Sequence, residues 1–228
     1  ARLVDRTEGN PLFARQLIGH WVESGGLRAG DDGFELVTEE RALPDSIDEL
    51  WLERIDRLVE VFPPRHLGDV LQALELAAAL GREVDGAEWR AVCSRAELRL
   101  PDGLVAAMVE RGLADRTHDG WTFAHGMLVE TLAQRARQGG RWQAHHRRCA
   151  RMLADRGPSD AAERLGRRAN HWIAAGDGAR ALEPMRRQQR LLGLQGDYEG
   201  RRRVLERRQE VLERLGDDAD DYLSLDND

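Results

Sequence analysis

The apolar positions at the front of the chain predict two helices with a β-hairpin between them. Apolar residues recur at helical spacing after Pro11 and stop at the glycine pair 25–26, which predicts a helix over this stretch. The next segment, GLRAGDDGFELV, has a hairpin pattern with residues 32–33 as its turn. Ser46 and Glu49 then form a capping box, which predicts the start of a second amphipathic helix.

The middle of the chain predicts further helices and a pair of short strands. Helical spacing of apolar residues covers 67–80, about 86–93 and about 102–111. Two short β-like runs flank the turn residues 118–120, and another helical pattern covers about 127–137. Three helices followed by a two-stranded wing is the element order of a winged-helix domain.

From about residue 141 onward the pattern is helical throughout. Gly-Asp pairs recur at 176–177, 196–197 and 216–217, a spacing of 20 residues, and each interval holds one helix-sized pattern. Two such helices make a repeat of about 40 residues, close to the tetratricopeptide class. Pro184 lies inside one interval and predicts a kink or a late helix start there.

Charge is distributed unevenly along the chain. All 34 basic residues are arginine, so a P-loop lysine and a Schiff-base lysine are both excluded from this chain. Residues 135–216 carry 20 arginines against 10 acids, whereas residues 217–228 carry six aspartates and no basic residue. An acidic front, a basic middle and an acidic tail indicate at least two structural units. The tail's composition favours a disordered end over a segment that folds back on the basic helices.

The cysteines and histidines offer no clear chemistry of their own. Cys93 and Cys149 each lie in an apolar helical pattern, which favours buried, reduced thiols in a cytoplasmic protein over a disulfide. Metal-ligand spacing is absent, and the neighbours His145 and His146 point in different directions on a helix, so no metal site is expected. The sequence has neither a run of about 18 apolar residues nor a signal-peptide pattern, so no membrane partner is expected.

Several short motifs, in their order and spacing, resemble the back half of a STAND-type signalling ATPase. They are G-N-P-L-F at 9–13, L-P-D-S-I at 43–47, L-G-R at 80–82, F-A-H-G-M-L-V-E at 123–130, and R-x-x-x-H-x-x-x-x-A-x-x-L from Arg141 to Leu153. The resemblance extends to about residue 216. It is strongest with large bacterial regulators that join a serine/threonine kinase, an ATPase module with an AAA/NB-ARC-like lid, and tetratricopeptide repeats.

The resemblance implies a mainly α fold with short β-hairpins in four consecutive parts. Residues 1–43 correspond to a helical lid segment with a hairpin, and residues 44–138 to the winged-helix domain. Residues 139–216 correspond to the start of a tetratricopeptide-like helical array, and residues 217–228 are the acidic tail.

In that family a P-loop domain precedes the lid, and the nucleotide is held between them. The resemblance places Pro11 against the nucleotide base and His125 at the ADP β-phosphate, where an imidazole N–H can donate to a phosphate oxygen. Gly126 departs from the family's common His-Asp form, so a contribution from a following carboxylate is in doubt.

The implied function is regulatory rather than catalytic. The chain would be the nucleotide-sensing and protein-interaction segment of a cytoplasmic STAND-type ATPase. ADP or ATP would bind only in the parent protein, and no cofactor is expected for this chain alone. The expected partners are an upstream P-loop domain and a protein or small-molecule ligand on the helical repeats.

Two alternatives remain open at this point. One is a free-standing interaction scaffold built on the helical repeats. The other is a winged-helix DNA-binding regulator, for which the helix at 102–111 would be the recognition helix. That helix contains Asp102, Glu110 and a single arginine within the acidic front of the chain, so phosphate repulsion argues against a nucleic-acid partner.

Overall fold

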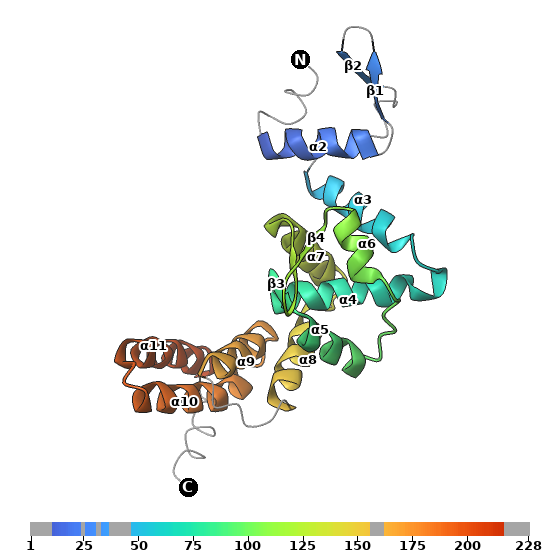
Figure 1. Ribbon diagram of the computed structural model, residues 1–228. Helices are drawn as coiled ribbons and strands as arrows, with labels where there is room; N and C mark the ends of the chain where they lie inside the picture. The colour runs from blue at the N-terminus through green and yellow to red at the C-terminus, as the bar shows by residue number, and fades with distance from the viewer. Residues whose placement is uncertain (1–10, 24–25, 31–32, 37–46, 156–161, 217–228) are drawn as a thin grey trace. The chain divides into compact units, whose positions relative to one another are not determined.

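The chain is mainly α-helical, with two small antiparallel sheets (Figure 1). The computed structural model describes residues 11–23, 26–30, 33–36, 47–155 and 162–216. Contacts divide the chain into two compact units, Ala1–Leu67 and Gly68–Asp228, and each is described by itself.

The first unit confirms the predicted helix, hairpin and helix. Helix α2 spans Pro11–Glu23, strands β1 (Leu27–Gly30) and β2 (Gly33–Leu36) pair in antiparallel register, and α3 spans Ile47–Val59. A short 3-10 helix, η2, follows at Pro64–His66. Both long helices bury an apolar face, and its described buried apolar side chains are Leu17, Trp21, Leu50, Trp51, Ile55 and Leu58. Ser46, the expected capping residue of α3, lies outside the described residues.

The second unit begins with a region of helices around a three-stranded sheet, called here the sheet region (residues 68–138). Its elements in chain order are α4 (Leu67–Leu80), β3 (Glu83–Asp85), α5 (Gly86–Arg95), α6 (Leu104–Glu110), β4 (Ala114–Arg116), β5 (Gly120–Phe123) and α7 (Gly126–Gln138). The strand order is β3-β5-β4, and both pairs are antiparallel. The helices and the β4–β5 pair were predicted from the sequence, whereas β3 was not.

The sheet packs on an aromatic core. The rings of Trp89 and Phe123 each contact Trp121 edge-on, with centroid separations of 5.4 and 4.7 Å. The indole N–H of Trp89 donates to the Ala73 carbonyl at 2.8 Å and so ties α5 to α4. Asp85 ends β3 and caps α5, accepting the backbone N–H groups of the second and third helical residues.

The rest of the second unit is a helical array of α8 (Trp142–Asp155), α9 (Ala162–Ala174), α10 (Gly178–Leu194) and α11 (Tyr198–Leu215). The Gly-Asp pairs form its turns. Gly176 and Gly196 adopt positive φ angles of +74° and +77°, which end the preceding helices. Asp177 and Asp197 then accept a backbone N–H from the first turn of α10 and α11, respectively.

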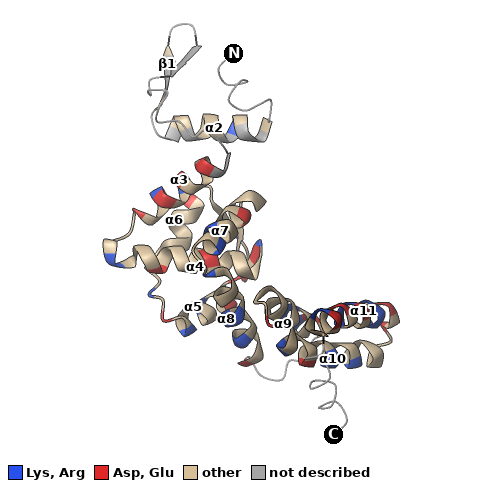
Figure 2. Ribbon diagram, turned by 180° about the vertical axis from the view of Figure 1, so that it is seen from behind, with Lys and Arg blue, Asp and Glu red and all other residues tan. Residues whose placement is uncertain are grey.

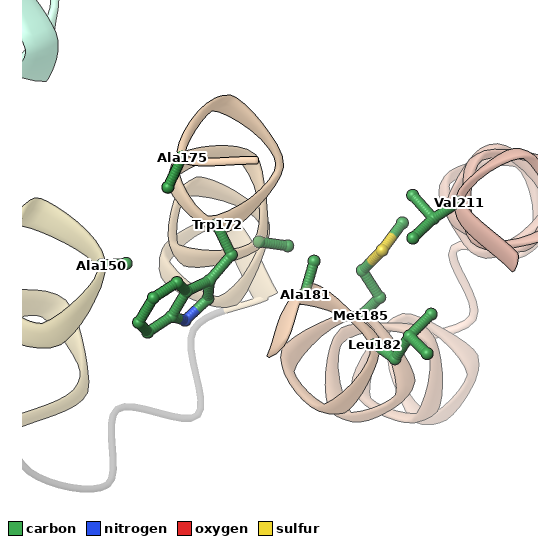
Figure 3. Close-up of a cluster of buried hydrophobic side chains, with 8 residues drawn as sticks. Ala150, Trp172, Ala175, Ala181, Leu182, Met185 and Val211 are labelled. Carbon is green, nitrogen blue, oxygen red and sulfur yellow. The ribbon is translucent and has the colours of Figure 1, made fainter. Parts of the chain in front are cut away.

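Successive helices of the array share one apolar core (Figure 3). Trp172 of α9 lies among Ala150 of α8 and Ala181 of α10, and Met185 of α10 meets Val211 of α11. Pro184 is buried within α10, which begins at Gly178 and runs through the proline. Of the two alternatives predicted for this proline, a kink or a late helix start, the late start is wrong, because the Asp177 cap and the buried face outweigh the hydrogen bond that proline cannot donate.

Candidate functional site

His125 lies where the central strand of the sheet ends and a long helix begins. It occupies the N-cap position of α7 with extended backbone (φ −134°, ψ 137°), and it is half-buried. The first turn of α7 contains no acidic residue, and the side chain of His125 does not cap the helix. The junction therefore presents backbone N–H groups, the positive end of a helix dipole and an imidazole, a combination that suits an anion.

The structure brings a second sequence motif to the same junction. Arg82, from the L-G-R segment, accepts the Phe123 N–H at 2.9 Å through its backbone carbonyl. Its guanidinium Nε–H donates to the Phe123 carbonyl at 3.4 Å, and the hydroxyl of Thr122 donates to its carbonyl at 3.2 Å. The exposed cationic side chain of Arg82 thus lies beside Phe123, two residues before His125, and adds positive charge near the junction.

Pro11, the other nucleotide-contact candidate, is the first residue of α2 and is exposed. The predicted helix start at this proline is confirmed. Pro11 belongs to the first unit and His125 to the second.

The R-x-x-x-H motif has an internal partner that the sequence did not reveal. Arg141 donates through Nε and Nη2 to the two carboxylate oxygens of Glu75, at 2.9 and 2.7 Å, and His145 Nε2 lies 2.8 Å from Glu75 Oε2. Glu75 and His145 are fully buried. Burial acts to raise the pKa of the Glu75 carboxyl, but the hydrogen bonds from Arg141 and His145 outweigh it and lower that pKa below its ordinary value.

A second buried carboxylate repeats the arrangement. Glu88 of α5 receives two hydrogen bonds from Arg167 of α9, at 2.5 and 3.1 Å. Together the two clusters join α4 and α5 of the sheet region to α8 and α9 of the array, and we call these five residues the seam: Glu75, Glu88, Arg141, His145 and Arg167. A carboxylate removed from water needs such charged partners, so each cluster ties a helix of the sheet region to the array.

His146 points away from the seam and pairs with another histidine. Its Nδ1 lies 2.8 Å from Nδ1 of His171 in α9, and the ring of Trp142 meets it edge-on at 4.5 Å. Burial lowers the pKa of His146 to about 4 and that of His171 to about 3. The adjacent histidines of α8 therefore have separate partners, as expected from their positions on a helix.

The described residues hold no group of three or more His, Cys, Asp or Glu side chains placed to bind one metal ion. Cys93 and Cys149 are buried and free, and burial raises the pKa of each thiol to about 12, which keeps both thiols protonated at neutral pH. Every helix in the described part of the chain is too short or too polar to serve as a membrane span.

A hollow of about 510 Å³ lies against the sheet. It is lined by β3, the β4–β5 turn and α9, and its one arginine, Arg167, is outnumbered by four carboxylates: Glu83, Asp85, Asp119 and Glu163. A phosphate would be repelled there, so the junction at His125 is the better anion site in the described part of the chain.

Comparisons with protein-family models, with curated proteins and with solved structures found no match to this chain.

Proposed function

We propose that this chain is the regulatory segment of a STAND-type signalling ATPase, which senses bound nucleotide and reports it through protein contacts. It has no catalytic activity of its own in this proposal, because a chain without lysine cannot supply the P-loop residue that grips the phosphates. That residue would come from a P-loop domain elsewhere in the parent protein.

The order of elements in the sheet region carries the proposal. Helix α4 is followed by β3, then by α5 and α6, and then by the β4–β5 hairpin, with β5 at the centre of the sheet. This is the order of a winged-helix domain, and β3 supplies the strand that the sequence pattern lacked. The F-x-H motif follows directly on the central strand, as it does in the family that the sequence resembles.

The helical array supports the reporting half of the proposal. Gly-Asp turns join α9 to α10 and α10 to α11, and the four helices share one core, which is typical of tetratricopeptide-like repeats (Figure 3). The seam links this array to α4 and α5, so a protein or small-molecule ligand on the repeats would act on the same body that carries His125.

The residues at the α7 junction fit the phosphate end of ADP. His125 would donate an imidazole N–H to a phosphate oxygen, the N-terminus of α7 would offer backbone N–H groups, and Arg82 would add positive charge. Pro11 would contact the base from the lid side. Release of these contacts would favour nucleotide exchange, which makes the arrangement a switch between two states.

The test replaces His125 with Ala in the parent protein and follows the loss of pre-bound fluorescent ADP. We expect faster loss of ADP and higher basal signalling, because the replacement removes a phosphate contact. The matched control is His118→Ala, whose side chain is 98% exposed at the β4–β5 turn and should leave ADP retention unchanged. Equal retention of ADP in the His125 variant and the unchanged protein would count against a phosphate contact by His125.

The DNA-binding alternative is disfavoured by the structure of the helix that would read the bases. Helix α6 spans only Leu104–Glu110, has the sequence LVAAMVE and contains no arginine, since Arg111 falls at its C-cap. A helix with this composition has no donor for a base edge or a phosphate. A gel-shift titration across salt concentrations would detect DNA binding as a steep negative salt dependence.

A further inference from the structure

We draw no further inference here: the strongest candidate, the hollow between β3, the β4–β5 turn and α9 (Figure 2), rests on a cluster of exposed acidic side chains, and nothing in the described part of the chain shows what cation or partner would fill it.

Discussion

His146 and His171 show how burial and geometry together set the charge of a residue pair. Their Nδ1 atoms are 2.8 Å apart, so one ring must donate a proton and the other must accept it. Protonation of both rings would place two N–H groups against each other in a site with little water. The pair is therefore stable only while at least one ring is neutral.

This pair predicts a loss of stability in mild acid. Histidine in the unfolded chain has an ordinary pKa of 6.5, whereas the folded values are about 4 and about 3. Between these limits the unfolded chain takes up protons that the folded chain does not, so the free energy of unfolding falls as pH falls. The slope contributed by each histidine approaches about 1.4 kcal/mol per pH unit below pH 6.

Urea unfolding measured from pH 7 to pH 5 checks this prediction, because Glu75 and other carboxyl groups contribute mainly below that range. His171→Asn should reduce the slope of the free energy of unfolding against pH by the contribution of one histidine. His118→Asn, which changes an exposed side chain, should leave the slope unchanged. The same slope in the unchanged protein and in both variants would show that His171 is not a source of the pH dependence.

At the scale of elements, one glycine determines whether the sheet can have its third strand. Gly120 lies opposite Asp85 at the start of β5. A Cβ at this position would lie 2.0 Å from the Val84 carbonyl oxygen and 2.6 Å from the Gly86 nitrogen. Both are backbone atoms held by the β3–β5 pairing and by the start of α5, so neither can move without breaking that pairing.

Gly120→Ala is therefore expected to destabilise the fold by about 3 kcal/mol, the upper part of the range for overpacked sites. Gly126→Ala is the matched control, because it lies at the start of α7 with nothing within 4 Å of its added Cβ. That variant should change stability by less than about 1 kcal/mol and is expected to stabilise the helix. Thermal or urea unfolding compares the stability of the two variants. Similar losses of stability would show that the close backbone contact at Gly120 is not the cause of the destabilisation.

The helices could be predicted from sequence because their signal is local. Apolar spacing, Gly-Asp pairs and Pro11 each act within one or two turns of chain, and α4 matches its predicted range of 67–80. Strand β3 has only three residues and depends on Thr122, Trp121 and Gly120 far along the chain. A strand this short has no period to detect, so its position follows from tertiary pairing alone.

At the scale of the whole molecule, the seam decides whether the sheet region and the array behave as one body. Glu75 lies in the middle of the apolar helix α4 and is fully buried, with Arg141 and His145 as its partners. Removing one partner of a buried ion pair is strongly destabilising, because it leaves an uncompensated charge in the interior.

Glu75→Gln is expected to lower the free energy of unfolding by about 3 kcal/mol, because it leaves Arg141 and His145 without a carboxylate. It should also speed the reaction of Cys93 and Cys149 with a thiol reagent, since these buried cysteines lie on α5 and α8, on the two sides of the seam. Glu206→Gln, which breaks an exposed pair with Arg202, should cost less than about 0.5 kcal/mol. Matching effects in the two variants would argue against a special role for the buried cluster.

The candidate site was only partly accessible from sequence. His125 could be placed at a strand-to-helix junction because the F-x-H motif and the following helix are neighbours in the chain. Arg82 and Glu75 could not be assigned, since they lie 41 and 66 residues from Phe123 and Arg141. A lone glutamate within the apolar run LQALELAAAL was the available signal for Glu75, because such a charge requires a buried partner.

The Gly-Asp turns have a consequence for how an array of this kind grows. Each turn ends one helix and starts the next with two adjacent residues, so a 20-residue stretch that begins with aspartate and ends with glycine carries the signals for both of its own ends. In-frame duplication of such a stretch would add a helix without requiring a new linker. Recombination between copies could therefore lengthen or shorten the array one helix at a time while every existing junction stays intact.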